Sequence, residues 1–241
     1  MHRFFTDPAA VGGGKITITG EDVAHITRVL RLQAGDEIVV CDGQSNDYRC
    51  AIRAADKQAV ELEILEHTHT GVECPVDITL YQGLPKGDKM DYIVQKCVEL
   101  GVNKVVPVAA KRSVARPKDE GKKQARWQRI AAEAAKQCGR GILPQVGAVC
   151  PFDGALAQGQ GLLLMPYECE RDSSIRTVLQ AHPTARQVSI YIGPEGGFDP
   201  SEAALAAQAG AYTVSMGPRI LRTETAPIAA VTAVLYQLGD W

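Results

Sequence analysis

Glycine, proline and charged residues gather where two apolar stretches end. The stretch at 188–192 leads into Gly193-Pro194-Glu195-Gly196-Gly197. Glycine lets backbone amides come close to a bound molecule. Ligands of open α/β sheets bind at the carboxyl ends of the strands. This corner therefore predicts a ligand site, with a tight turn that binds nothing as the alternative. It matches neither GxGxxG nor the phosphate-binding GxxxxGK[ST] pattern.

A second corner follows the apolar residues at 213–216. Gly217-Pro218 comes first, and then Arg219, Arg222 and Glu224 fall within six residues, before an alanine-rich segment. Arginine can hold an anionic partner, and a carboxylate can move a proton. A salt-bridged surface loop is the alternative. Two such corners after two strands favour a ligand site more than either would alone.

Positive charge is concentrated in one segment of a mildly acidic chain. Residues 104–140 have a net charge of +8, residues 1–70 have a net charge of −4, and the whole chain has −2. Within the segment, side chains recur every three or four residues and share one helical face: Lys122, Arg126, Arg129, Glu133, Lys136 and Arg140. The basic stretch 111–118 precedes them. This pattern favours an RNA or phosphate surface, with a solvated helix face as the alternative.

The elements that position these residues change in kind near residue 76. Before it, short alternating strands are predicted at 15–19, 37–41, 48–53 and 60–64, with one helix that buries Val23, Ile26, Val29 and Leu30. They indicate a small β-rich barrel, followed by a linker at 67–75. After residue 76, strands are predicted at 78–82, 104–108, 161–165, 188–192 and 213–216, with a shorter one near 145–149. Helices are predicted at 89–100, 121–138, 173–181, 200–208 and 225–238. This alternation is typical of an α/β parallel sheet covered on both faces.

Composition excludes several classes of protein. Apolar residues make up 45% and charged residues 22%, which is ordinary for a globular chain and argues against disorder. The longest apolar runs fall far short of the ~20 residues that span a bilayer. The first residues lack the order of a secretory signal. Seven cysteines without a CxxC pair indicate no zinc site. We expect a soluble, cytoplasmic protein with no metal and no membrane partner.

Other basic residues stand near predicted functional edges. Lys86 and Lys89 follow a strand and open a helix, so they are expected at the ligand edge of the sheet. In the N-terminal part, Arg3 and the i,i+3 series His25, Arg28 and Arg31 lie beside apolar stripes. An ordinary charged surface helix is the alternative for this series.

Six stretches together resemble one family. They are HRFF at 2–5, HITRVLRL at 25–32, QGLPKGDKMDYIVQKCVELGV at 82–102, EAAKQCGR at 133–140, IGPEGGF at 192–198 and MGPRILRTETA at 216–226. In this order they are similar to the family that methylates uridine N3 in bacterial 16S ribosomal RNA. That family belongs to the SPOUT superfamily of S-adenosylmethionine-dependent methyltransferases. The last two stretches are the most specific, and the resemblance covers essentially the whole chain.

The resemblance implies a fold and a cofactor site. Residues 1–70 should form a PUA-like barrel that helps to hold RNA, and residues 74–241 a SPOUT-type parallel sheet with a trefoil knot. The family works as a homodimer. The methyl donor, S-adenosyl-L-methionine, should lie in three loops of the knot, held mainly by backbone. On this chain the cofactor-binding residues are then Leu164, Met165, Ile192, Gly193, Pro194, Gly196, Gly197, Met216, Gly217, Ile220, Leu221 and Thr223.

The reaction implied by the resemblance needs charge stabilisation and a proton acceptor. Uridine N3 must lose a proton before it can attack the donor methyl group. Arg222 with Glu224 is the predicted catalytic pair, and Arg219 comes next. The partner is 16S rRNA or the 30S ribosomal subunit, and the residues expected to bind it are Arg3, His25, Arg28, Arg31, Lys86, Lys89, Arg112, Lys122, Arg126 and Arg140. The alternatives are a non-catalytic SPOUT-like RNA-binding module, methylation of another RNA base, and a nucleotide-using enzyme built on the glycine-rich corner.

Overall fold

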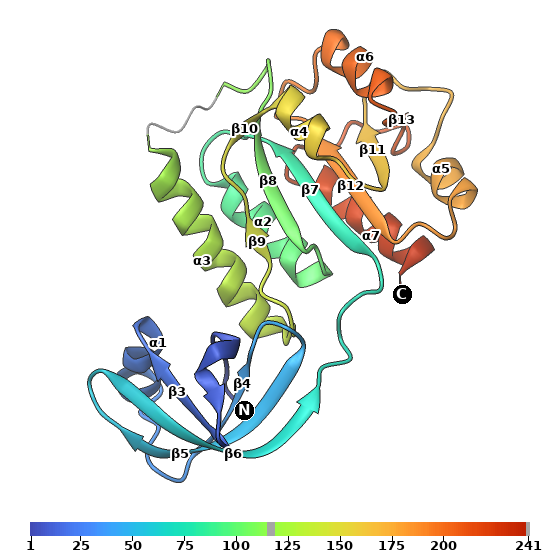
Figure 1. Cartoon of the computed structure of the whole chain (residues 1–241). Helices are drawn as coiled ribbons and strands as arrows, with labels where there is room; N and C mark the ends of the chain where they lie inside the picture. Colours follow the sequence, from blue (N-terminus) through green and yellow to red (C-terminus); the bar gives the residue numbers. More distant parts are fainter. Residues whose placement is uncertain (115–118, 240–241) are drawn as a thin grey trace. The chain divides into compact units, whose positions relative to one another are not determined.

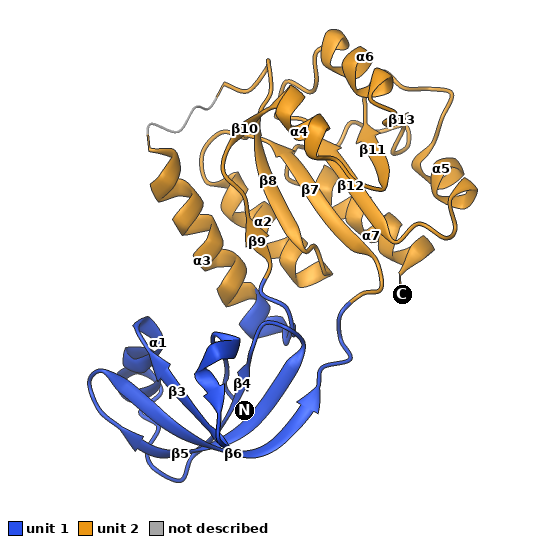
Figure 2. Cartoon of the chain, in the orientation of Figure 1, with its two compact units in different colours: residues 1–73, 135–143 blue, residues 74–134, 144–241 orange. Residues whose placement is uncertain are grey.

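The chain divides into two compact units that are not consecutive in sequence. The computed structural model describes residues 1–114 and 119–239. Figure 2 shows that unit 1 comprises Met1–Glu73 and Ala135–Leu143, and unit 2 comprises Cys74–Ala134 and Pro144–Trp241. Part of the predicted basic stretch, residues 115–118, lies outside the described residues. None of the helices in the described ranges has the length and hydrophobicity that a membrane span needs.

Unit 1 is built on a six-stranded sheet. Its strands are β1 (Arg3–Phe5), β2 (Val11–Gly12), β3 (Lys15–Thr19), β4 (Glu37–Cys41), β5 (Asn46–Ala55) and β6 (Ala59–His69). Their order is β1-β4-β5-β6-β3-β2, and every pair is antiparallel except β1 with β4. Side chains of β3 alternate between exposed and buried, as expected for a strand with one face on a core. That core includes Phe4, Ile16, Ile18, Ile38, Val40, Ile52, Val60 and Leu62.

The helix and the linker of unit 1 differ from prediction. The α-helix is short, α1 (Glu21–Ala24), and continues as a π-helical turn over His25–Val29. A π turn has a different number of residues per turn from an α-helix, so the side chains that face inward change. Val29, predicted to be buried, is 70% exposed. Strand β6 also continues through the start of the predicted linker, because His67 pairs with Tyr48 of β5.

A buried ion pair holds residues 135–143 within unit 1. Arg140 is 4% exposed, and its guanidinium donates to the Glu73 carboxylate at 2.7 Å. The same carboxylate accepts the backbone N–H groups of Gly141 and Ile142. Arg140, predicted to bind RNA, is thus buried and paired within unit 1. The helix ends at Cys138 and Gly139 has a φ of +81°, so Arg140 leaves the basic helical face and turns inward.

Unit 2 is an α/β structure around a parallel sheet. Figure 1 shows its strands, which are β7 (Asp77–Gly83), β8 (Lys104–Ala109), β9 (Gln145–Val146), β10 (Cys150–Pro151), β11 (Leu162–Pro166), β12 (Gln187–Ile192) and β13 (Tyr212–Val214). The order is β10-β8-β7-β12-β11-β13, with β9 also on β8, and every pair is parallel. The predicted parallel sheet is confirmed. The trefoil knot stays a prediction.

Helices cover both faces of this sheet (Figure 1). They are α2 (Lys89–Leu100), α3 (Glu120–Cys138), α4 (Phe152–Gln158), α5 (Ile175–Ala181), α6 (Pro200–Gln208) and α7 (Ala226–Leu238). The α2 and α7 helices pack together on one face, and α4 with α6 on the other. The sequence analysis does not predict the seven-residue helix α4. The α6 helix begins with the predicted capping box of Asp199 and Glu202.

The Arg140–Glu73 pair provides a test of the unit 1 description. In Arg140→Met, the Glu73 carboxylate stays largely buried without its cationic partner. Breaking a buried pair on one side costs about 3–5 kcal/mol. We expect a lower free energy of unfolding, measured by urea denaturation. Lys122→Met is the control, because the side chain of Lys122 is 88% exposed. Equal stability of the two variants would contradict the structural role of Arg140.

Candidate functional site

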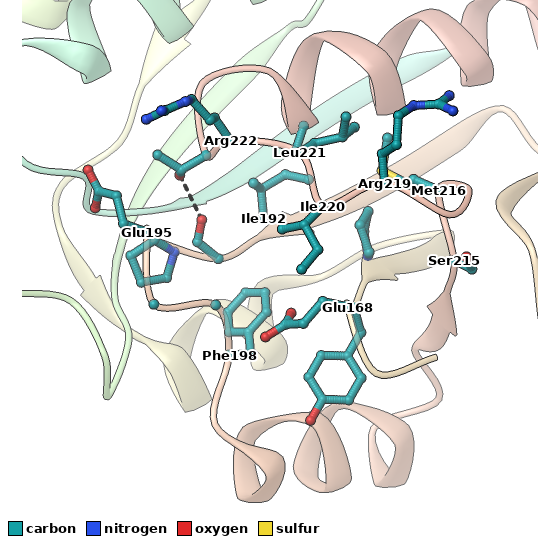
Figure 3. A pocket seen from close by; sticks show the side chains of 18 of the residues that line it. Glu168, Ile192, Glu195, Phe198, Ser215, Met216, Arg219, Ile220, Leu221 and Arg222 are labelled. Carbon is teal, nitrogen blue, oxygen red and sulfur yellow. Dashed lines mark hydrogen bonds between the residues drawn. The ribbon is translucent and has the colours of Figure 1, made fainter. Parts of the chain in front are cut away.

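A cavity of about 460 Å³ opens where three neighbouring parallel strands end. Strand β11 lies between β12 and β13, so the loops that follow these three strands leave the same edge of the sheet. Figure 3 shows the side chains from these loops around the cavity. The lining comprises Lys89, Pro166, Tyr167, Glu168, Arg171, residues 192–198, residues 215–223 and Ala226. The size is typical of a site for a small organic ligand.

Most of the predicted cofactor residues line this cavity. They are Ile192, Gly193, Pro194, Gly196, Gly197, Met216, Gly217, Ile220, Leu221 and Thr223. Leu164 and Met165 do not line it, because both are fully buried inside β11 and Met165 belongs to the hydrophobic core. The loop residues Pro166, Tyr167 and Glu168 take their place. Pro166 ends the apolar run of β11, so this proline marks in the sequence where the loop begins.

The Thr223 hydroxyl connects the segments that form the cavity. It donates a hydrogen bond to the Gly193 carbonyl at 2.8 Å and accepts one from Gln82 Nε2 at 3.1 Å. Both Thr223 and Gln82 are buried. The end of β7, the loop after β12 and the loop after β13 are thereby held together. Sequence reasoning missed Gln82, because a single glutamine at a strand end carries no signal of its own.

Close backbone packing at two glycines fixes the shape of the loop after β12. A Cβ atom on Gly83 would lie 2.6 Å from Pro194 Cδ, so only glycine lets this loop pass over the end of β7. Gly197 has a φ of +66°, and a Cβ there would collide with Glu168 Oε1. Its N–H donates to the Pro194 carbonyl at 2.9 Å, which closes the turn. The loop is therefore a tight backbone corner packed against the end of β7.

Lys89 lies between two carboxylates. Its Nζ is 3.0 Å from Glu195 Oε1 and 3.3 Å from Glu224 Oε2. Hydrogen bonding to Glu195, followed by that to Glu224, raises the pKa of Lys89. Burial opposes ionisation of Glu195, but the bonds from Lys89 and from the Lys86 N–H outweigh it, so the pKa of Glu195 is lowered. Lys89, predicted to bind RNA, thus joins the two loops that carry these carboxylates.

The predicted catalytic residues are only partly brought together. Arg219 and Arg222 line the cavity and are exposed, and in Figure 3 their guanidinium groups point in opposite directions. Glu224 is not part of the lining and is held by Lys89 instead. Between the arginines, Ile220 is 87% exposed. An apolar side chain so exposed on a cavity wall offers contact surface to an apolar ligand group.

The remaining basic residues fall into two groups. Some are committed to ion pairs within their own unit: Arg3 with Asp47 at 2.6 Å, Arg112 with Asp199 at 3.3 Å and Arg126 with Asp91 at 2.5 Å. Arg112 also donates to the Gly196 carbonyl at 3.1 Å, so it supports the cavity wall. The others, Arg28, Arg31, Lys86 and Lys122, have exposed side chains, while His25 packs edge-on against Phe4.

In the part of the chain that the structure describes, no cluster of histidine, cysteine or acidic residues could hold a metal ion.

Comparisons with known proteins agree along the whole chain. A family model described as RNA methyltransferase domain matches residues 72–235, and one described as RNA methyltransferase PUA domain matches residues 18–65. A Bacillus subtilis (strain 168) protein named ribosomal RNA small subunit methyltransferase E is 36% identical over 248 residues, covering 98% of this chain and 97% of the relative.

Two similar solved structures were determined with a bound cofactor. The Neisseria gonorrhoeae ribosomal RNA small subunit methyltransferase E, bound to S-adenosyl methionine, is 34% identical with a TM-score of 0.90, and the match covers 100% of this chain and 99% of that one. A Legionella pneumophila putative methyltransferase in complex with the same cofactor is 27% identical with a TM-score of 0.87, covering 99% and 98%.

The role of the Thr223 hydroxyl in holding the loops can be tested by measuring thermal stability. Thr223→Val keeps the shape of the side chain but leaves the Gly193 carbonyl and the Gln82 amide each without one partner. Such a loss costs about 1–3 kcal/mol. We expect a lower melting temperature in calorimetry. Thr225→Val is the matched control, because Thr225 is exposed and its side chain does not cap α7. If both variants melt alike, the hydroxyl does not hold the loops.

Proposed function

Because the chain belongs to the RNA methyltransferase family, we propose that it transfers a methyl group from S-adenosylmethionine to N3 of a uridine in 16S rRNA of the small ribosomal subunit. The observation that carries the proposal is the cavity at the ends of β11, β12 and β13, with Arg219 and Arg222 on its lining. The base and the position of the uridine rest on the family resemblance of the sequence motifs.

The residues present suit the methyl donor. The cavity is large enough for a drug-sized ligand and combines apolar side chains with backbone polar groups, as such sites do. The loops at 192–198 and 215–223 would hold the donor. A side chain at Gly197 would fill part of the cradle, because its Cβ would meet Glu168. When bound, the sulfonium supplies an electrophilic methyl group, so the protein has to orient the two substrates and stabilise charge.

Arg222 is the proposed charge-stabilising residue. Loss of the N3 proton spreads negative charge onto the neighbouring carbonyl oxygens of uracil, and a fixed guanidinium stabilises that charge as it develops. Arg219 is the second candidate on the same loop. Glu224 is the proposed proton acceptor, acting directly or through water, and Lys89 holds its carboxylate. Arg219 and Arg222 are exposed on the cavity lining, where an incoming base can reach them.

RNA binding, dimerisation and location complete the proposal. Arg28 and Arg31 of unit 1 and Lys86 and Lys122 of unit 2 are exposed cations suited to phosphate contacts. A homodimer is proposed because the family that the sequence motifs resemble works as one, and α2 and α7, which pack together, each carry an exposed tyrosine, Tyr92 and Tyr236. The protein would act in the cytoplasm, where small ribosomal subunits are found.

Methylation of ribosomal substrates tests the function. Purified 30S subunits and free 16S rRNA, both from a strain that lacks this activity, are incubated with protein and labelled donor. The RNA is then digested to nucleosides. We expect labelled 3-methyluridine. A different labelled nucleoside would overturn the base assignment, and donor binding without any label in either substrate would favour a non-catalytic RNA-binding module.

The role of Arg222 predicts a selective loss of rate. Neutral uridine needs little from the guanidinium, whereas the developing anion needs a fixed positive donor. In Arg222→Ala, single-turnover methylation at saturating donor should slow by on the order of 10²–10³-fold. Binding of donor and of 30S subunits should change far less. Arg176→Ala, an exposed arginine on α5 outside the cavity, is the control. A near-normal rate in Arg222→Ala would transfer the role to Arg219.

A further inference from the structure

One carboxylate of the cavity has no hydrogen-bond or ion-pair partner among the residues that the structure describes. The lining contains two acidic residues, Glu168 and Glu195. Glu195 is satisfied by Lys89 Nζ and by the backbone N–H of Lys86, each at 3.0 Å. Across residues 1–114 and 119–239, no hydrogen bond or ion pair reaches the Glu168 carboxylate. A ligand that covers this group must supply hydrogen-bond donors, because a desolvated carboxylate without them is costly.

The Glu168 carboxylate lies against the backbone corner described above. The carboxylate lies so close to Gly197 that a Cβ atom there would collide with Oε1. Figure 3 shows Glu168 on the side of the cavity where Phe198 lies, and Arg222 on the opposite side. Ile220 also extends into the cavity. The carboxylate therefore belongs to the part of the site with apolar walls, away from the proposed reacting end.

Three parts of the donor differ in what they need from the protein. The adenine ring needs apolar surface, the ribose offers two hydroxyl donors, and the methionine end carries charges. Adenine matches the walls formed by Phe198 and Ile220, and the ribose directly adjoins adenine. An ionised carboxylate only accepts hydrogen bonds. Paired acceptance from ribose hydroxyls is a recurrent use of acidic residues in nucleotide-binding folds.

We propose that Glu168 is a donor-binding residue whose carboxylate accepts hydrogen bonds from the ribose hydroxyls of S-adenosylmethionine. The inference rests on the proposed function, since it assumes this methyl donor. The resemblance implies that the donor is held mainly by backbone groups. The proposal adds a polar contact from a side chain of the loop after β11. Because Gly197 has no side chain, there is also room beside it for the Glu168 carboxylate.

Calorimetric titration of the full chain tests the assignment with two ligands. S-adenosylmethionine carries every part of the donor, whereas 5′-methylthioadenosine keeps adenine and ribose but lacks the amino-acid end. Glu168→Gln should bind both ligands on the order of 10- to 100-fold more weakly than the wild type. Asp172→Asn is the matched control, because it removes one negative charge from an exposed residue near the same loop but outside the cavity. It should bind both ligands like the wild type.

A third ligand isolates the hydroxyl groups. The 2′,3′-dideoxy form of 5′-methylthioadenosine should bind the wild type more weakly than the ribose form by a similar factor. In Glu168→Gln, that preference should nearly disappear, since the two changes remove the same interaction. An undiminished preference would overturn the proposal. Weakened binding of S-adenosylmethionine alone would also overturn it, because the carboxylate would then face the amino-acid end.

Failure of the proposed function gives a different pattern. If wild-type protein binds neither S-adenosylmethionine nor 5′-methylthioadenosine, the donor itself is misassigned. If the wild type binds both and Glu168→Gln binds them equally well, only the role of Glu168 is wrong. Circular dichroism of each variant verifies that a loss of binding does not come from a loss of fold.

Discussion

The cavity depends on the Thr223 hydroxyl and its two hydrogen bonds. The hydroxyl accepts a hydrogen bond from the Gln82 amide at the end of β7. It donates one to the Gly193 carbonyl in the loop after β12. These segments are distant in sequence, 141 residues apart between Gln82 and Thr223. Since the side chains of Thr223 and Gln82 are buried away from water, their hydroxyl and amide groups must find partners inside the protein. This requirement fixes the register of the loops before any ligand arrives, so the site is preorganised.

The parallel sheet and most of its helices follow from the sequence, because long periodic segments constrain both strand faces and helix stripes. The boundaries of α2 and α6 agree with prediction, and the glycine corners do lie at strand ends. The site was predictable where glycine and proline mark a turn. It was not predictable where a single residue acts through a distant contact. Gln82 begins the family stretch at 82–102, but its contact with Thr223 cannot be seen in that stretch, and Glu168 lies in none of the six stretches.

The contacts of charged residues were harder to predict than the strands and helices. A basic residue looks the same in sequence whether it faces water or a carboxylate. Arg140 leaves the basic helical face because the helix ends two residues earlier. Its guanidinium then pairs with the Glu73 carboxylate inside unit 1. Arg126 and Lys89 meet Asp91, Glu195 and Glu224 across element boundaries that spacing along one helix does not reveal. The positive charge of residues 104–140 thus divides between holding the fold together and remaining open to solvent.

The discontinuity of unit 1 has a consequence for synthesis on the ribosome. Glu73 is made 67 residues before Arg140, and the Gly141 and Ile142 N–H groups that complete its shell come later still. At ~5–20 residues per second, the barrel strands wait for several seconds with an unpaired carboxylate. Meanwhile β7, β8 and most of α3 leave the exit tunnel. Unit 1 therefore cannot finish folding until residues 135–143 have been made, and a fragment ending at Glu73 would lack the groups that pair with its carboxylate.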